Sequence, residues 1–460
     1  MYWANFLHIY QPPTQKEIWV RRITKESYRK LFSGFLNIPN CRLTLNINSI
    51  LCELLEKWGG EDVIWDIKEL VKRGNIELTG SAKYHAFLPL IPEKEIERQI
   101  RLNEEGLNKY FGEYWKKNGF FSPEMAYSDK VAQVAKKMGY KWLVIDEMSF
   151  PASLAGESSE KKYQPDRIYE IDGLDDFGVF FRERNLSFIV LSAQIGTMPA
   201  IVRYLGDRLN KNEYALTAMD GETFGHHRPG MEQFLFDLLS DEKINTVQIS
   251  DLYNTFKDRE KIKPKPSTWA ATEDDIKRGE PYARWNRKDN EIQKNQWKLT
   301  NLAIDVASRD KENEPIRSML DQAVHSDQYW WASARPWWSL EMIERGAHDL
   351  KQVVLDSSKP SQEEKQRAEE LYKNIVYIGF KWQREGKVDE IARQEDEDVL
   401  GRLHQKGKLF ITKEEYGQMI ETLKEQVRSS AKDEDYHRAA MLKDRILELG
   451  QEMEKAKPLN

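Results

Sequence analysis

Cysteine is scarce in this chain of 460 residues, where only Cys41 and Cys52 occur. Two cysteines cannot make the disulfide framework of a small secreted domain, and the sequence has no CxxC pair, no HExxH and no Walker-type loop. The common motifs of zinc, redox and nucleotide chemistry are therefore missing, and we expect neither a metal nor a cofactor. Cys41 and Cys52 are predicted to be buried free thiols of a reducing compartment, and a disulfide between them is the alternative.

Long apolar runs and a strong charge of either sign are missing as well. No stretch of about 18 apolar residues exists, and residues 2–10 begin a strand with no basic segment, hydrophobic core or cleavage site. Basic residues number 70 against 76 acidic ones, and both kinds are spread along the chain, so that the net charge is −6. No basic surface for nucleic acid is predicted. We expect no nucleic-acid or membrane partner and a cytoplasmic location.

Short apolar runs alternate with amphipathic stretches over the first 260 residues. Helical stretches such as 50–58, 93–110 and 130–138 separate the runs, which is typical of a parallel sheet with helices outside it. The runs interpreted as strands are 2–9, 42–47, 76–79, 119–122, 142–145, 188–191 and 215–219. This pattern predicts an α/β fold but does not separate an open sheet from a closed barrel.

Two acids directly follow apolar runs. Asp220 lies in AMDGETFGHHRPG (218–230), after the run 214–219, and Glu124 comes after 119–122, with Pro123 restricting the backbone before it. Such a pair at strand ends suits work on a glycosidic bond, because one carboxylate attacks the anomeric carbon and the other acid protonates the departing oxygen. For either acid alone, capping of the following helix is the simpler interpretation.

Three more polar segments shift this balance. They are FLHIYQPP (6–13), GNIELTGSAKYHAFLPLIP (74–92) and a tryptophan-rich segment (269–338) that holds seven of the 14 tryptophans. Their order and spacing resemble the conserved regions of the family 57 glycoside hydrolases. The resemblance covers roughly residues 2–400 and implies a (β/α)7 barrel followed by an α-helical domain, with a retaining mechanism on α-glucans.

The first of these regions departs from the family at one position. The family pattern of His, any residue, His, Gln and Pro falls on residues 8–12, where Tyr10 takes the place of the second histidine. Tyrosine can donate a hydrogen bond to a sugar hydroxyl but cannot carry a proton at neutral pH. The role of this position is therefore open.

The resemblance also implies roles for individual side chains, with Glu124 as the nucleophile and Asp220 as the general acid/base. Together with the tryptophan-rich segment, it leads us to expect the following substrate-binding residues: His8, Gln11, Glu77, Glu222, His226, His227, Trp269, Asp327 and Trp330. Tryptophan faces stack on pyranose rings. In each of the pairs 330–331 and 337–338, however, at least one ring is predicted to pack in the core, since neighbours on a helix point in different directions.

Three parts are expected along the chain. They are the catalytic barrel at 1–260, a helical domain at 261–405 that completes the active-site cleft, and a C-terminal helical hairpin at 406–460. The first boundary rests on the proline-broken charged segment 261–267. In the hairpin, apolar residues recur at helical spacing on both sides of a turn and N-cap at 433–435.

The segment AKDEDYHRAAMLKDRILEL (431–449) resembles the UVR motif of excision-repair proteins and some bacterial protease adaptors, in which the hairpin pairs with a partner. A hairpin this small exposes one apolar face unless it docks. We therefore expect a protein partner or self-association through residues 413–453. A plain end-cap or a dimerisation helix pair is the alternative.

The motifs favour a retaining hydrolase of α-1,4 bonds in maltooligosaccharides that works through a glucosyl-enzyme intermediate. A 4-α-glucanotransferase or branching enzyme would use the same residues with a glucan hydroxyl as the acceptor. Tyr10 and the hairpin also suit a catalytically poor glucan-binding regulatory protein. Metal-dependent sugar deacetylation is a further possibility, in which Asp220, His226 and His227 would imitate a metal triad.

Overall fold

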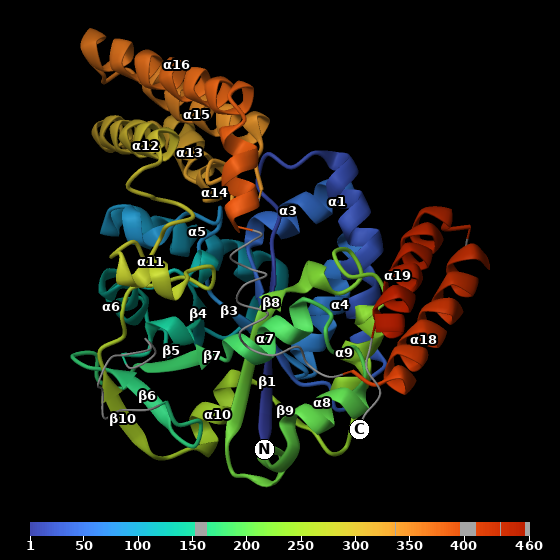
Figure 1. The fold of residues 1–460 in the computed structure, drawn as a ribbon. Coiled ribbons are helices and arrows are strands. Elements are labelled where there is room, and N and C mark those ends of the chain that lie inside the picture. The colour runs from blue at the N-terminus through green and yellow to red at the C-terminus, as the bar shows by residue number, and fades with distance from the viewer. Residues whose placement is uncertain (152–162, 336, 396–410, 433, 456–460) are drawn as a thin grey trace.

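A closed ring of strands forms the first half of the chain in the computed structural model, which describes residues 1–151, 163–335, 337–395, 411–432 and 434–455 (Figure 1). The ring runs in the order β1, β2, β3, β4, β5, β7, β8 and back to β1. Its strands are β1 (Tyr2–Ile9), β2 (Leu43–Ile47), β3 (Ile76–Thr79), β4 (Gly119–Phe121), β5 (Trp142–Asp146), β7 (Gly178–Arg182) and β8 (Tyr214–Asp220). The expected (β/α)7 barrel is thereby confirmed.

Two short contacts close this ring. Gly80 N donates to Gly119 O and Phe121 N donates to Gly80 O, each at 2.9 Å, which joins the end of β3 to β4. On the other side, Glu183 N donates to Leu216 O at 2.7 Å, which joins β7 to β8. A Cβ atom at Gly80 would lie 2.0 Å from Tyr140 Oη, so a larger residue could not sit at the first of these contacts.

Alternate side chains of each strand fill the barrel. Phe6, Phe121, Val144, Phe180 and Leu216 belong to this inner cluster, and each is at most 1% exposed. Because the side-chain period of a strand is two, each strand turns alternate residues into the same interior up to its C-terminal end.

The predicted strand at 188–191 is wrong. These residues belong to α7 (Arg184–Leu191), and the strand of this unit is β7. A run of four apolar residues fits a strand or a helix equally well, and the wider pattern decides between them. Leu186, Ile189 and Val190 are buried at the i, i+3, i+4 spacing of a helix face.

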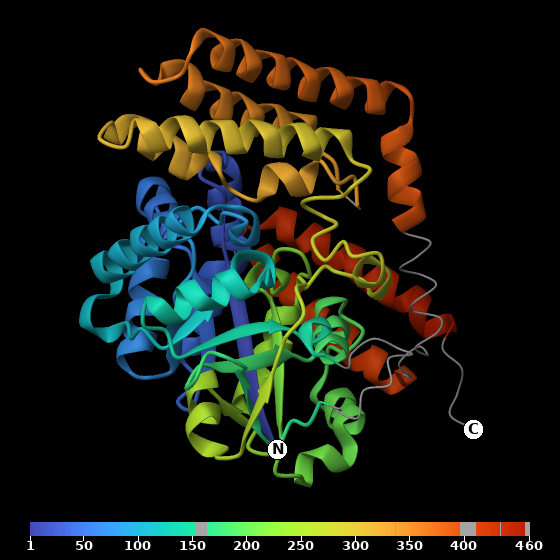
Figure 2. The same cartoon turned by 90° about the vertical axis from the view of Figure 1, so that its left-hand side faces the viewer.

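Helices cover the outside of the barrel (Figures 1 and 2). They are α1 (Glu17–Ile23), α2 (Arg29–Leu36), α3 (Ser49–Trp58), α4 (Glu61–Lys72), α5 (Glu93–Phe111), α6 (Asp129–Lys137), α7, α8 (Met198–Leu205), α9 (Met231–Ser240) and α10 (Ile249–Thr255). Cys41 and Cys52 are both buried in the core beneath them as free thiols, which confirms that prediction.

Two further strands extend the sheet outward from β7. β6 (Ile168–Ile171) pairs antiparallel with β7, and β10 (Arg259–Ile262) pairs parallel with β6. The boundary expected after residue 260 therefore falls inside β10, and the connection to the helical region begins after Ile262.

A layer of helices lies over the C-terminal ends of the barrel strands (Figure 2). Its members are α12 (Glu291–Arg309), α13 (Glu314–Ala323), α14 (Asp327–Trp331), α15 (Leu340–Asp356) and α16 (Gln362–Arg384), and the short helix α11 (Glu273–Lys277) precedes them. Arg317 of α13 donates to Glu95 of α5 at 2.6 Å, and Arg98 of α5 contacts both carboxylate oxygens of Asp321 at 2.8–2.9 Å. These ion pairs attach the layer to the barrel. The boundary expected at residues 405 and 406 lies outside the described residues.

The C-terminal hairpin consists of α18 (Lys413–Lys432) and α19 (Tyr436–Lys455), and it lies against the side of the barrel near α9 (Figure 1). A buried ion pair joins Arg438 to Glu232 of α9, and a half-exposed one joins Arg203 of α8 to Glu415. Leu423 packs so closely on Gly230 that a Cβ atom there would lie 2.3 Å from its Cδ2. The barrel therefore covers apolar surface of the hairpin that was expected to need a partner. In the part of the chain that the structure describes, no helix is long and apolar enough to cross a membrane.

Candidate active site

Neighbouring strands bring the predicted catalytic residues to the C-terminal mouth of the barrel. In the strand register, His8 on β1 lies beside Asp220 on β8 and beside Asn46 on β2. Glu124 lies in the turn that follows β4. This is the end of the barrel that the helical layer covers, and it is where the loops of βα units build active sites.

Glu124 is held through both its backbone and its side chain. Its φ angle of +63° lies in the left-handed region, which non-glycine residues occupy only where their surroundings compel it. Trp269 supplies that constraint, since its backbone N donates to Glu124 O at 3.3 Å and its indole Nε1 donates to Glu124 Oε2 at 2.9 Å. Burial and the charges of Asp220 and Asp327 raise the pKa of Glu124 to about 8.

Asp220 ends β8 above a buried ion pair. Burial raises the pKa of Asp220 to about 6, and the positive charge of Arg182 opposes this rise. Arg182 Nε donates to Ala218 O at 2.7 Å, and its NH1 donates to Asp146 Oδ2 at 2.9 Å. The arginine and its partner thus place a fixed cation near the acid, at the level of the barrel just below it.

Tyr10, which replaces the family histidine, links the barrel to the helical layer. Its hydroxyl donates to Asp327 Oδ2 at 2.8 Å, and the same oxygen lies 3.0 Å from His325 Nδ1. The Tyr10 ring stacks on His85, with the ring centroids 4.1 Å apart and the planes 14° apart. Hydrogen bonds from His325 and Tyr10 lower the pKa of Asp327 against the effect of its burial, so this carboxylate is ionised.

Three residues of the site were missed in the sequence: His85, Ser326 and Asn46. His85 Nε2 lies 3.2 Å from His8 Nε2, and His85 Nδ1 lies 2.8 Å from Ser326 Oγ. His8 Nδ1 lies 2.7 Å from Asn46 Oδ1. His85 and Ser326 both belong to segments that the sequence analysis singled out, whereas Asn46 is one polar residue in an apolar strand and gives no signal of its own.

Glu222 and Gln11 lie behind Asp220 rather than beside Glu124. Glu222 Oε1 accepts hydrogen bonds from the Tyr28 hydroxyl and from Gln11 Nε2, the latter at 3.3 Å. Burial and the charge of Asp220 raise the pKa of Glu222 to about 8. The two predicted binding residues therefore form a buried support for the loop after β8.

His226 and His227 continue that loop toward the C-terminal hairpin. His226 Nδ1 lies 2.5 Å from Glu26 Oε2, and His437 of α19 lies 3.7 Å from the other oxygen of Glu26. Burial lowers the pKa of His227 to about 4, so it is neutral. Among the residues that the structure describes, no three His, Cys, Asp or Glu side chains are placed to hold a metal ion.

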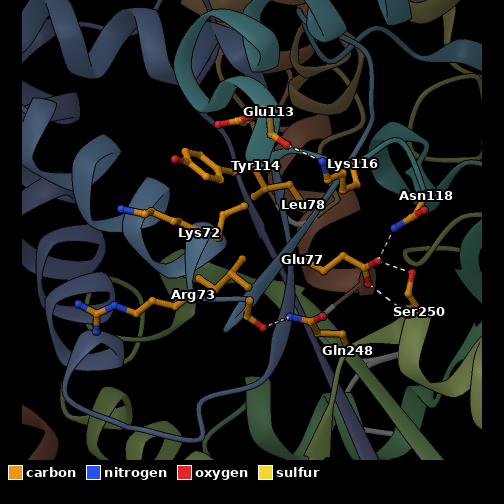
Figure 3. A pocket seen from close by; sticks show the side chains of 13 residues that line it. Lys72, Arg73, Glu77, Leu78, Glu113, Tyr114, Lys116, Asn118, Gln248 and Ser250 are labelled. Atoms are coloured by element: carbon orange, nitrogen blue, oxygen red, sulfur yellow. Dashed lines mark hydrogen bonds between the residues drawn. The ribbon is translucent and has the colours of Figure 1, made fainter.

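The structure does not bring Glu77 into this group. Its neighbours in the register are Thr44 and, through it, Phe6, which lie two residues before the level of His8 and Asp220. The Glu77 carboxylate accepts from Ser250 N at 3.1 Å and from the Ser250 hydroxyl at the start of α10, and from Asn118 Nδ2 at 3.5 Å (Figure 3). Glu77 therefore caps a helix, which is the simpler interpretation considered above for acids that follow strands.

A cavity of about 570 Å³ opens beside Glu77 at the N-terminal end of the barrel. Lys72, Arg73 and Lys116 lie along it (Figure 3). Arg73 and Lys72 are already paired with Glu69, and Lys116 Nζ donates to Glu113 O at 2.6 Å. These basic side chains therefore already have partners.

In the two tryptophan pairs, at positions 330–331 and 337–338, some rings pack against other side chains and others are exposed. Trp330 lies on α14 close to Asp327, is half-buried and packs against Trp331 and the core of the helical layer. Trp338 stacks on Trp382, with the centroids 6.2 Å apart, whereas Trp337 is 60% exposed. Packing of at least one ring of each pair is therefore confirmed.

Comparison with known proteins agrees with this architecture. The model of glycosyl hydrolase family 57 matches residues 5–265, which is more than half of the chain. An α-amylase from Pyrococcus horikoshii is 24% identical over 265 residues, covering 55% of this chain and 40% of the relative. A 4-α-glucanotransferase from Thermococcus litoralis is 22% identical over 253 residues, covering 52% and 37% of the two chains. The chain thus spans less than half the length of these curated relatives.

A solved structure extends the similarity beyond the barrel. The branching enzyme of the same family from Thermococcus kodakaraensis, in complex with glucose, superposes with a TM-score of 0.63 at 15% identity. The match covers 81% of this chain and 94% of that enzyme, so it includes helical elements that follow the barrel. At this identity it supports the fold alone. From its barrel, its acids at strand ends and the family match over residues 5–265, the chain belongs to glycosyl hydrolase family 57.

Proposed function

We propose that this protein is a retaining glycoside hydrolase that cleaves α-1,4 bonds in maltooligosaccharides. The observation that carries the proposal is the meeting of two buried acids, Glu124 and Asp220, at strand ends, close enough for the charge of one to raise the pKa of the other. Trp269 holds Glu124 and offers an aromatic ring at the site. The α-amylases among the relatives support an α-glucan as the substrate.

In the proposed reaction, Glu124 attacks the anomeric carbon while Asp220 gives its proton to the departing oxygen, so that a glucosyl ester forms on Glu124. Asp220 then takes a proton from water, the water oxygen attacks the anomeric carbon, the bond from that carbon to the Glu124 oxygen breaks, and both acids return to their first state. His8, Asp327 and Trp330 are proposed to contact the sugar rings, and Glu222 to support the loop. A retaining enzyme should hold the two carboxyl groups roughly 5 to 5.5 Å apart.

The resting site holds its proton in the unproductive place. With a pKa of about 8 for Glu124 and about 6 for Asp220, the proton that these two acids share near neutral pH lies mainly on Glu124, and Glu222, with a pKa of about 8, holds its own proton behind Asp220. The reaction requires the opposite arrangement, with Glu124 ionised and Asp220 protonated. The productive form is therefore a minor tautomer of the free enzyme, and the two acids titrate as a pair.

Product analysis with maltoheptaose tests the proposal. Wild-type protein should release shorter products whose first-formed anomer is α by NMR, and Glu124→Gln and Asp220→Asn should abolish them. Glu77→Gln is the matched control, since it makes the same change in a barrel acid that caps α10, and it should retain activity. A β anomer formed first would contradict retention.

The same experiment separates the alternatives. Products longer than maltoheptaose beside shorter ones would assign a 4-α-glucanotransferase, and new α-1,6 branches would assign a branching enzyme. If the wild-type protein binds maltoheptaose without cleaving it, and Glu124→Gln binds it equally well, the protein is a glucan-binding regulatory protein.

For the C-terminal hairpin we propose an internal role first, as a brace on the loop between β8 and α9. The contacts of Arg438, Glu415 and Leu423 with the barrel support it. The resemblance to the UVR motif and a protein partner for residues 413–453 stay predictions. Sedimentation of the full chain at rising concentration tests self-association, and a constant monomer mass would contradict it.

A further inference from the structure

A continuous line of hydrogen-bonding groups runs from β2 to the nucleophile. Asn46 Nδ2 donates to Thr79 Oγ1 at 3.1 Å, and Asn46 Oδ1 lies 2.7 Å from His8 Nδ1. From His8 the line continues to His85 at 3.2 Å and to Ser326 Oγ at 2.8 Å. Ser326 Oγ lies 3.5 Å from Glu124 Oε1. Asn46, Thr79, His8, His85 and Ser326 are all at most 4% exposed, so water does not interrupt the line.

The direction of each hydrogen bond follows from Asn46. A carboxamide oxygen only accepts, so His8 Nδ1 carries the hydrogen. Burial lowers the pKa of His8 to about 4 and that of His85 well below its usual range, so both rings are neutral. The second nitrogen of His8 is therefore an acceptor, and His85 Nε2 must donate to it. His85 Nδ1 is then an acceptor in turn, and it takes the hydroxyl hydrogen of Ser326.

This order leaves Ser326 without a hydrogen for Glu124. Only lone pairs of Ser326 Oγ face Glu124 Oε1, and the lone pair of His85 Nδ1 faces the same oxygen from 3.8 Å. An ionised Glu124 would gain nothing from either neighbour, whereas a protonated Glu124 can donate to Ser326.

We propose that Asn46 is a positioning residue that fixes the tautomers of His8 and His85 and, through Ser326, keeps the hydrogen of Glu124 on its carboxyl group in the free enzyme. Glu124 is released as a nucleophile when its carboxyl hydrogen passes to the Asp220 carboxylate, which the proposed reaction needs protonated, and the Ser326 hydroxyl turns from His85 Nδ1 to donate to Glu124. One proton leaves Glu124 and one arrives on Asp220, and both histidines keep the tautomers that Asn46 sets. The inference rests on the proposed role of Glu124 only for its consequence in catalysis.

Other charged groups face Glu124 from several elements. Asp220 at the end of β8 and Asp327 on α14 both disfavour its ionised form, and His85 after β3 is neutral. Arg182 on β7 acts on Asp220. These charged groups stay in place when Asn46 is changed. A change in the pKa of Glu124 in an Asn46 variant therefore reports the direction of the hydrogen bonds in the line.

The first test needs no substrate, and so it stands whether or not the proposed activity is found. Ring nitrogens of 15N-histidine-labelled protein are recorded by NMR, with His8→Gln and His85→Gln spectra for assignment. We expect His8 as the Nδ1–H tautomer, which is the rarer form in water, and His85 as the Nε2–H tautomer. His8 as Nε2–H, or either ring as a cation at pH 7, would overturn the proposal.

The second test follows the alkaline limb of kcat/KM. Asn46→Leu removes the oxygen that accepts from His8, and Thr79→Val allows the Asn46 carboxamide to rotate and exchange its oxygen and nitrogen. Both variants should lower the alkaline pKa of kcat/KM by on the order of one pH unit. Asn46→Asp keeps an acceptor and should not lower it. Thr44→Val removes a buried hydroxyl from the same face of β2 outside the line and is the matched control. An unmoved limb in a folded Asn46→Leu variant would contradict the inference.

Discussion

Buried carboxyl groups concentrate at the mouth of this barrel, and their pKa values differ because their neighbours differ. Burial raises the pKa of Asp220 to about 6, with Arg182 opposing the rise. Glu124 has no cation near it, and the charges of Asp220 and Asp327 add to its burial to give a pKa of about 8. Asp327 has its pKa lowered, by His325 and Tyr10. The charge of the site at neutral pH is therefore set by which acids have partners.

The pH dependence of kcat/KM should be bell-shaped with limbs near 6 and 8. The active form carries one proton on the pair Glu124 and Asp220, so activity is lost when a second proton is added below about 6 and when the only proton leaves above about 8. Initial rates at low maltoheptaose concentration across pH 4.5–9.5 measure both limbs. A flat profile between pH 5 and 9 would contradict the shared proton.

Glu124→Gln should stabilise the fold more at pH 8 than at pH 5. The folded pKa is raised, so the stability associated with this group is fully present below its unfolded pKa and is lost as pH rises toward about 8. Glutamine removes that loss, which we expect to be worth about 1–3 kcal/mol at pH 8. Thermal unfolding at the two pH values is the measurement.

The control for that variant is Glu312→Gln, because the Glu312 side chain is 90% exposed. It should change the melting temperature equally little at both pH values. If the gain in stability of Glu124→Gln did not grow with pH, burial would not raise the pKa of this acid.

The sequence identified the two acids because each follows a buried strand, and a strand end is readable from local pattern. It misplaced Glu77 for the same reason. Glu77 follows one apolar residue of β3, but its side chain points to the level of Thr44 and caps α10. The height of a strand residue along the barrel axis depends on the register between neighbouring strands. No single segment of the sequence determines that register. Asn46 was missed on the same ground.

The hairpin helices are attached to the barrel by pairs of opposite charge rather than by apolar surface alone. Arg438 and Glu232 are 5% and 6% exposed, and Arg203 pairs with Glu415 at the other end of α18. Breaking a buried pair from one side leaves the other charge without a partner in a poor solvent.

Arg438→Gln should therefore release or destabilise the hairpin by about 2–4 kcal/mol, seen as a lower urea midpoint or faster proteolysis between α18 and the barrel. Lys424→Gln is the matched control, because Lys424 and Glu421 are exposed partners on the same helix pair. Equal behaviour of the two variants would mean that the hairpin is not held by the buried pair.

Helices were more predictable than strands in this chain. The stretches expected at 50–58, 93–110 and 130–138 agree with α3, α5 and α6 to within a residue or two, because an amphipathic period over three turns is a long signal. The short strand β7 was missed, since its five residues include Gly178 and Arg182 and its apolar neighbour α7 offered a stronger run.

The active site is complete only when the helical layer is in place, because Asp327, His325 and Ser326 come from that layer and Tyr10, His85 and Glu124 from the barrel. The buried pair of Arg317 with Glu95 and the partly buried pair of Arg98 with Asp321 hold the two parts together.

Arg317→Gln should lower both kcat and the free energy of unfolding, the latter by about 2–4 kcal/mol. The change leaves the buried carboxylate of Glu95 without its partner and loosens the segment that carries Asp327. Arg317→Met combined with Glu95→Leu should recover most of the stability, since apolar residues of similar size can replace a buried pair. Thermal unfolding and turnover of maltoheptaose are measured for both. A double variant no more stable than the single one would contradict the role of the pair.

The place of β1 in the ring has a consequence for how the chain is made. β1 pairs with β2 from Phe6 to Ile9 on one edge and with β8 from Tyr2 to His8 on the other, and β8 ends only at Asp220. At a synthesis rate of about 5–20 residues per second, the first strand waits roughly 10–40 s on the ribosome with one edge unpaired. The unpaired backbone N–H and C=O groups of such a strand can form hydrogen bonds with a strand of another chain. Newly made chains of this protein should therefore depend on protection of their first strand, and slower translation before residue 220 should lower the yield of folded enzyme.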